Sequence, residues 1–153
     1  MSVPNNIISI DDANDLYANF KNNMRSASET QFATIDYQEL KDYLSFIEKE
    51  ASDAGVTIEG LRVYFGKNPK GKFPSSKTPL KPDANTVFIN PTTNFSGIIG
   101  EISFAIQTIG TNKRAVTVGD VLNNRLSSIQ SLSGNDWELP PPPPSNDPND
   151  FHI

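Results

Sequence analysis

An arginine and a tyrosine two positions apart, Arg62 and Tyr64, are the most distinctive candidates for chemistry in this sequence. They alternate with apolar residues, so in a β-strand both polar side chains project from the same face. The arginine guanidinium is a planar fork of donors that fits a carboxylate or a phosphate, and tyrosine adds a hydroxyl on a rigid ring. Together with Lys67, the pair is a candidate site for binding a small anionic ligand such as a nucleotide. The interpretation that the sequence favours for the pair is structural, an ion pair or a stack on a neighbouring ring.

The residues that most nucleophilic and metal chemistry requires are scarce. The sequence has no cysteine, which excludes disulfides, thiolate nucleophiles and cysteine-based zinc sites. The single histidine, His152, is the second-last residue, so a Ser-His-Asp triad or a histidine metal site is not expected. No P-loop, dinucleotide-binding glycine motif or nucleophile elbow is present. We therefore expect no cofactor and no metal, and the sequence favours a protein that is not an enzyme.

Carboxylates are the remaining candidates for catalysis. Several occur at spacings typical of an exposed helical surface, namely Asp36, Glu39, Asp42 and Glu48. Glu59 and Glu101 flank predicted strands, but nothing in the sequence brings them together. A hydrolase with paired carboxylates, or a carboxylate-bound hard cation, therefore has no specific support.

Charge is unevenly distributed along the chain. The net charge of −5 argues against general affinity for nucleic acid. From Arg62 to Asp83, however, lie six of the thirteen basic residues and one of the eighteen acidic residues. The lysines of this segment are Lys67, Lys70, Lys72, Lys77 and Lys81. Interspersed prolines break any helix, and a loop of roughly eighteen residues is longer than compact domains usually contain. The segment is either a solvated loop or a surface for an anion or an acidic partner.

The carboxyl-terminal segment has a different composition from the rest. The prolines from Pro140 to Pro144 predict a polyproline II rod of about 15 Å. An acidic spacer follows, and the chain ends in Phe151-His152-Ile153. The segment is either a disordered tail or a docking peptide whose stiffness lets Phe151 and Ile153 bind a groove at a lower entropic cost. We expect residues 1–139 to form one domain and residues 140–153 to form this tail.

The strand that carries Arg62 is expected to begin at Gly60. Its other face consists of Leu61, Val63 and Phe65, and the alternation predicts that this apolar face packs together with the preceding helix. A second strand is predicted over residues 86–90 and ends at Asn90-Pro91, because proline cannot donate to the ladder.

Further elements follow from periodicity and capping signals. Apolar residues at three- and four-residue steps predict a helix from Ile10 to Met24. A second helix is predicted to begin at Asp36, with Glu39 completing a capping-box-like start, and to end at Gly55. Alternation predicts two more strands, over residues 102–107 and 115–118. The last apolar positions predict a final helix over residues 121–129, which Thr117 or Gly119 precedes. The fold class is α+β, an antiparallel sheet of three to five strands packed against two or three helices.

One pair of motifs carries a resemblance to other proteins. They are Gly60-x-Arg62-x-Tyr64-x-Gly66-Lys67 and Thr86-x-Phe88-x-Asn90-Pro91-Thr92. The chain resembles a group of bacterial proteins of uncharacterised activity. In that group a helix like the one at residues 35–44 precedes a G-[IL]-R-[IV]-Y-F-G-K strand and a T-x-F-x-x-P-T strand, and the chain closes in a proline-rich end. The resemblance covers residues 35–93 and implies an architecture without an activity. Tails in the group often carry cysteines among the prolines, and this chain has none.

The sequence favours a non-catalytic protein-interaction module. The basic loop and the proline-rich tail would bind a protein partner or other copies of the chain. Binding or processing of a small anionic ligand at Arg62, Tyr64 and Lys67 is the alternative, and an effector or immunity-type protein is a third class. No apolar run is long enough to span a membrane, and the first residues lack the segments of a secretion signal, so we expect a cytoplasmic protein.

Overall fold

The computed structural model describes residues 4–23, 33–67 and 85–134, which belong to two compact units. The described part of the first unit is residues 4–23 and Ala33, and that of the second is residues 34–67 and 85–134. Each unit is treated by itself. The expectation of one domain over residues 1–139 stays a prediction.

The first unit contains helix α1, Ile10–Asn22, which confirms the helix predicted there. Ser9 is its N-cap, and its hydroxyl accepts a hydrogen bond from the Asp12 backbone N–H at 3.0 Å. No residue of the helix is buried. The amphipathic spacing thus identified the helix, although none of its apolar residues is buried in the structure.

The second unit begins with helix α2, Tyr37–Asp53. Asp36 caps it by accepting a hydrogen bond from the Glu39 backbone N–H at 2.9 Å, and Gly55 follows its end with a left-handed φ of 69°. The buried side of α2 includes Ile47 and Ala51, which join Phe104 and Ile106 of the sheet, together with Leu132 after the last strand, in the hydrophobic core. Both predicted ends of this helix are confirmed.

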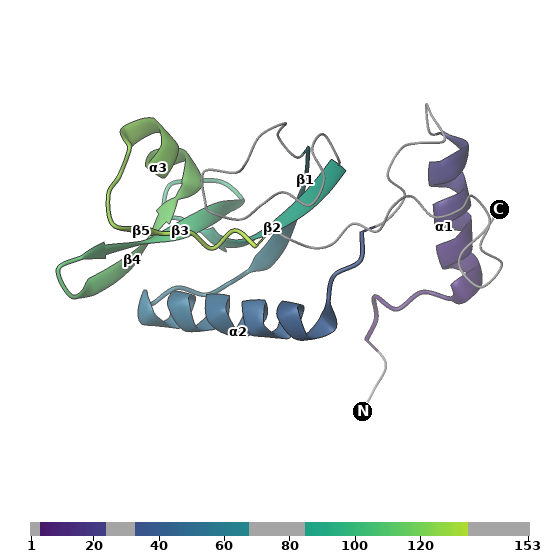
Figure 1. Cartoon of the computed structure of the whole chain (residues 1–153), viewed down its shortest axis with the longest axis horizontal. Coiled ribbons are helices and arrows are strands. Elements are labelled where there is room, and N and C mark those ends of the chain that lie inside the picture. The colour runs from purple at the N-terminus through teal and green to yellow at the C-terminus, as the bar shows by residue number, and fades with distance from the viewer. Residues whose placement is uncertain (1–3, 24–32, 68–84, 135–153) are drawn as a thin grey trace. The chain divides into compact units, whose positions relative to one another are not determined.

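The second unit also contains a five-stranded antiparallel sheet (Figure 1). Its strands are β1 (Gly60–Lys67), β2 (Asn85–Asn94), β3 (Glu101–Ile109) and β4 (Asn112–Thr117), in that order, and β5 (Ile129–Gln130), which pairs with β3. In Figure 1 helix α2 runs along one side of this sheet. Three helices and an antiparallel sheet within the described residues confirm the α+β class.

The prediction that Asn90-Pro91 ends the second strand is wrong, because β2 continues through Pro91 to Asn94. Thr92 pairs with Ser103 on β3, so the same register sets Pro91 opposite Phe104, whose carbonyl would accept the N–H that proline lacks. The Asn90 side chain replaces that donor, with Nδ2 lying 3.1 Å from the Phe104 carbonyl oxygen. Asn90 is only 2 % exposed, so this hydrogen bond is shielded from water.

The final helix is shorter and lies earlier than predicted. Helix α3 is Val118–Asn124, with Thr117 as its N-cap, and it ends at Arg125, whose φ of 46° is left-handed. Ile129, which helical spacing had assigned to this helix, lies in β5 instead. A short apolar run fits both a helix and a strand, and here pairing with β3 decides the outcome.

Candidate functional site

Arg62 and Tyr64 lie on the same face of β1, and both contact neighbouring strands. Tyr64 is paired with Phe88 on β2, and their rings stack with centroids 4.8 Å apart. The Tyr64 hydroxyl lies 2.8 Å from the hydroxyl oxygen of Ser103 on β3, and Arg62 Nη2 donates to the Glu101 carbonyl oxygen at 2.9 Å. The two side chains therefore reach across β2 and tie β1 to β3.

The electrostatics of this pair favour negative charge. The hydrogen bond with Ser103 lowers the pKa of Tyr64, and a hydrogen bond and the positive charge of Arg62 lower it further, while partial burial acts in the opposite direction. Arg62 is exposed to solvent. The arrangement gives this face of β1 a cationic group beside a hydroxyl.

An acidic side chain lies at the start of the same face. The Glu101 carboxylate accepts a hydrogen bond from Thr92 Oγ1 at 2.8 Å. A Cβ atom at Gly60 would lie 2.8 Å from Glu101 Oε2, so the carboxylate lies close above the first residue of β1. Since Glu101 would repel an anion near Arg62, the face is less favourable for anions than the sequence alone indicates.

The other predicted site residues do not join this pair in the described structure. Lys67 is the last residue of β1, and strand alternation sets its side chain on the face opposite Arg62 and Tyr64. The remaining residues of the predicted binding surfaces lie outside the described residues, namely Lys70, Lys72, Lys77, Lys81, Phe151 and Ile153.

The apolar face of β1 is the main departure from expectation. Leu61, Val63 and Phe65 are 44 %, 51 % and 89 % exposed, so the prediction that this face packs together with the preceding helix is wrong. Their paired residues on β2, on the same face of the sheet, are buried, namely Pro91, Ile89 and Val87. The covering of this face therefore stops between β2 and β1. We call Leu61, Val63 and Phe65 the β1 stripe.

Among the strands that the structure describes, β1 is terminal in the sheet and pairs only with β2, so its backbone is open on the outer side. The Ile89 N–H and C=O are both bonded to Gly134, at 2.9 and 2.8 Å, on the side of β2 away from β1. Val63 and Ile89 are therefore a non-hydrogen-bonded pair, in which the Val63 N–H and C=O also point away from β2. These groups face the open edge.

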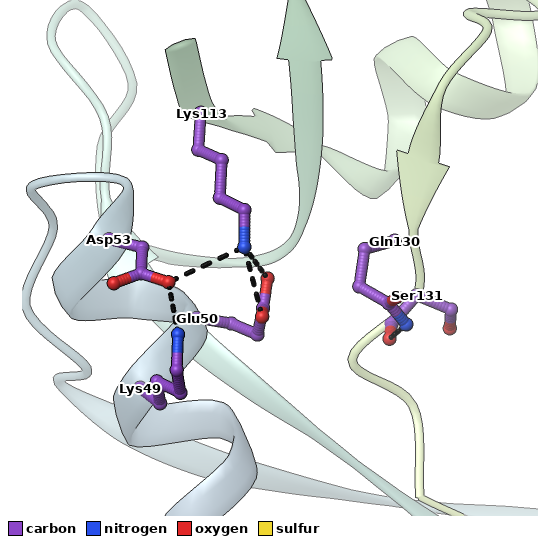
Figure 2. Close-up of polar contacts among 6 residues, drawn as sticks. All are labelled: Lys49, Glu50, Asp53, Lys113, Gln130 and Ser131. Atoms are coloured by element: carbon purple, nitrogen blue, oxygen red, sulfur yellow. Dashed lines mark hydrogen bonds and ion pairs between the residues drawn. The ribbon is translucent and has the colours of Figure 1, made fainter. Parts of the chain in front are cut away.

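A second polar cluster joins α2 to β4 (Figure 2). Lys113 Nζ lies 3.1 and 3.0 Å from the two carboxylate oxygens of Glu50 and 3.4 Å from Asp53 Oδ2, and Asp53 also pairs with Lys49 at 2.6 Å. The Lys49 hydrogen bond is the main cause that lowers the pKa of Asp53, and the Glu50 hydrogen bond is the main cause that raises the pKa of Lys113. The two lysines and the two carboxylates of the cluster balance each other's charge, so we assign the cluster a structural role.

The described residues contain no group of three or more histidine, cysteine, aspartate or glutamate side chains arranged to hold a metal ion. None of the helices in the described part combines the length and the apolar character required for crossing a membrane. Comparisons with protein-family models, with curated proteins and with solved structures found no match.

Proposed function

We propose that this protein is a non-catalytic protein-interaction module and that the outer part of β1 belongs to its binding surface. The observation that carries the proposal is the β1 stripe, three large apolar side chains exposed side by side on a terminal strand. Scattered apolar residues on a surface need no explanation, but contiguous ones beside an open strand edge are typical of interaction sites.

Burial provides the driving force for such an interaction. Covering a valine, leucine or phenylalanine side chain completely is worth about 1.5–3 kcal/mol. The open edge adds backbone donors and acceptors, which a partner strand satisfies. Apolar contact and strand pairing therefore act on the same partner.

The basic loop and the tail remain parts of this proposal. β1 leads directly into the loop at Lys67, so Lys70, Lys72, Lys77 and Lys81 follow the proposed surface along the chain. Phe151 and Ile153 are proposed as apolar contacts at the end of the tail. The proposed location is the cytoplasm.

Capture on immobilised protein tests this function, with the purified chain and a cell extract as the two sources of partners. Val63→Lys places a charge in the β1 stripe, and Ile99→Lys makes the same kind of change at a residue that is 101 % exposed elsewhere in the second unit. We expect Val63→Lys to reduce capture of a specific partner at least tenfold and Ile99→Lys to preserve it. Equal capture by the two variants would contradict a role for β1. Deleting residues 140–153 tests the tail, and unchanged capture and oligomeric state would remove it from the proposal.

Binding of a small anionic ligand at Arg62 and Tyr64 is the second candidate. The observation that favours it is the exposed guanidinium beside a hydroxyl whose pKa is lowered, chiefly by its hydrogen bond to Ser103. A thermal-shift screen with nucleotides and sugar phosphates tests it. Stabilisation that is lost in Arg62→Ala and kept in Lys41→Ala, which removes a positive charge from α2, would support this candidate. A screen without stabilisation would count against it.

A further inference from the structure

We propose that the partner of β1 is a second copy of this chain, which pairs with the strand's open edge in an antiparallel register centred on Val63. The inference rests on the proposed interaction function and identifies the partner. It follows from three features of β1: the direction of its backbone groups, the complementarity of its sequence to itself, and the exposure of the β1 stripe.

The backbone of β1 is prepared for a further antiparallel strand. Because the Val63 N–H and C=O point away from β2, strand periodicity directs those of Leu61 and Phe65 to the same open side. In an antiparallel pair centred on Val63, these three residues of each copy face the same three residues of the other. Each pair exchanges both of its hydrogen bonds, as in the closely spaced pairs of an ordinary ladder.

The side chains of residues 60–66 are complementary to themselves in this register. Val63 lies opposite Val63, Leu61 opposite Phe65, Arg62 opposite Tyr64, and Gly60 opposite Gly66. Apolar residues thus face apolar residues, and a guanidinium faces an aromatic ring. Each favourable pair other than the central one occurs twice, because the two copies are related by a two-fold axis.

Neighbouring registers lose this complementarity. A pair centred on Arg62 sets two guanidinium groups directly opposite each other, and like charges in that position are destabilising. A pair centred on Tyr64 sets Leu61 opposite Lys67 and Arg62 opposite Gly66, so the apolar pair of Leu61 and the pair of guanidinium and ring are both lost. The register centred on Val63 is therefore preferred.

Pairing also explains the exposure of the β1 stripe. A two-fold axis perpendicular to the sheet keeps corresponding faces of the two copies on the same side, so the two stripes meet on the face that α2 covers elsewhere. Phe65, the most exposed residue of the stripe at 89 %, then lies beside Leu61 of the partner subunit. The exposed stripe of one copy thereby becomes the cover for that of the other.

Single-cysteine variants of the full chain test the register, since the chain has no cysteine of its own. In the proposed dimer the two Cα atoms of residue 63 lie about 5.5 Å apart, which a disulfide can bridge. The two copies of residue 61 are offset by four residues, or about 13 Å along the strand, which a disulfide cannot bridge.

In a glutathione buffer we expect Val63→Cys to form disulfide-linked dimers at least tenfold more completely than Leu61→Cys. Ile99→Cys serves as the control for random collision and should also cross-link weakly. A mixture of Leu61→Cys and Phe65→Cys should form the mixed disulfide in preference to either self-disulfide. Equal cross-linking of all variants, or preferred self-linking of Leu61→Cys, would overturn the register.

Sedimentation velocity over a hundredfold range of concentration tests whether the pairing occurs without cross-links. We expect the wild-type chain to self-associate as concentration rises, Val63→Lys to remain monomeric and Ile99→Lys to behave as wild type. A wild-type chain that stays monomeric throughout, or self-association that Val63→Lys leaves intact, would overturn the inference. In either case the proposed function still stands if Val63→Lys loses a different protein in the capture experiment, and falls if it does not. Far-UV circular dichroism verifies that both lysine variants are folded.

Discussion

Two strands of one sheet present similar apolar residues on the same face, but the residues of one strand are buried and those of the other are exposed. On β3, Phe104 and Ile106 are 0 % exposed, whereas on β1 Val63 and Phe65 are 51 % and 89 % exposed. The pairings of β1 with β2 and of β2 with β3 show that all four side chains lie on one face. Alternation alone therefore does not separate a core strand from an exposed one.

The difference lies in where helix α2 packs. Ile47 and Ala51 of α2 meet Phe104, Ile106 and Leu132 in one buried cluster, and the Tyr43 hydroxyl donates to the Ile89 carbonyl oxygen at 3.0 Å and to the Leu132 carbonyl oxygen at 2.9 Å. No residue of β1 belongs to this cluster or packs against it. Among the described residues, one helix thus covers the middle of the sheet and leaves the apolar face of a terminal strand exposed.

Removing a core side chain from β3 should produce the largest effect. Phe104→Ala deletes a ring that is fully buried, so we expect unfolding to become easier by about 3–5 kcal/mol, as is usual for large-to-small changes in a core. Urea unfolding followed by circular dichroism measures the change. A loss below about 1 kcal/mol would mean that this part of the sheet is not the core.

The Asn90 side chain should have the next largest effect. Asn90→Ala removes the donor to the Phe104 and Pro91 carbonyl oxygens, and these buried groups are then left without it, so we expect a loss of about 2–3 kcal/mol. Ser133→Ala is the matched control, because it removes only the hydroxyl that donates to Asn90 Oδ1 at 2.8 Å. Equal losses in the two variants would contradict a special role of Asn90 beside proline.

Asn90 also shows which structural features could be predicted from the sequence and which could not. Local signals predicted the starts of α1 and α2 because a capping side chain and the backbone N–H that donates to it lie within three residues of each other. They failed at Pro91, where the substitute donor serves a carbonyl fourteen residues away. They also failed at the β1 stripe, because its exposure depends on where α2 packs. Arg62 and Tyr64 were placed on one face correctly, but their contacts with Glu101 and Ser103 required the order of the strands.

Tyr43 should make stability depend on alkaline pH. Burial is the main cause that raises its pKa from 10.0 to about 12, so the folded state disfavours the phenolate. Its contribution is therefore fully present below pH 10 and is lost as the pH rises towards 12. Because the side chain is only half-buried, we expect a loss of about 1–2 kcal/mol rather than the full value of the shift. Denaturation of wild type and Tyr43→Phe across this pH range measures it, and the Phe variant should lack this part of the decline.

Asp53 should contribute a smaller dependence at acid pH. The hydrogen bond from Lys49 is the main cause that lowers its pKa from 3.8, so its contribution is present above that pH and is lost as the pH falls below it. We expect Asp53→Asn to reduce the acid-induced decline in stability, and 1 M NaCl to weaken the effect by screening, at a Debye length of about 3 Å. A decline of unchanged steepness in Asp53→Asn would show that other carboxylates cause it.

The smallest effect should come from Phe65, the counterpart of Phe104 on the uncovered strand. Phe65→Ala deletes the same ring from a position that is 89 % exposed, so little apolar area returns to water on unfolding, and we expect a change within about 0.5 kcal/mol. The measurement belongs at low protein concentration, because self-association through β1 would stabilise the wild type by mass action. A loss close to that of Phe104→Ala under these conditions would mean that the chain itself covers the β1 stripe. A loss that appears only at high concentration would instead indicate that a second copy provides the cover.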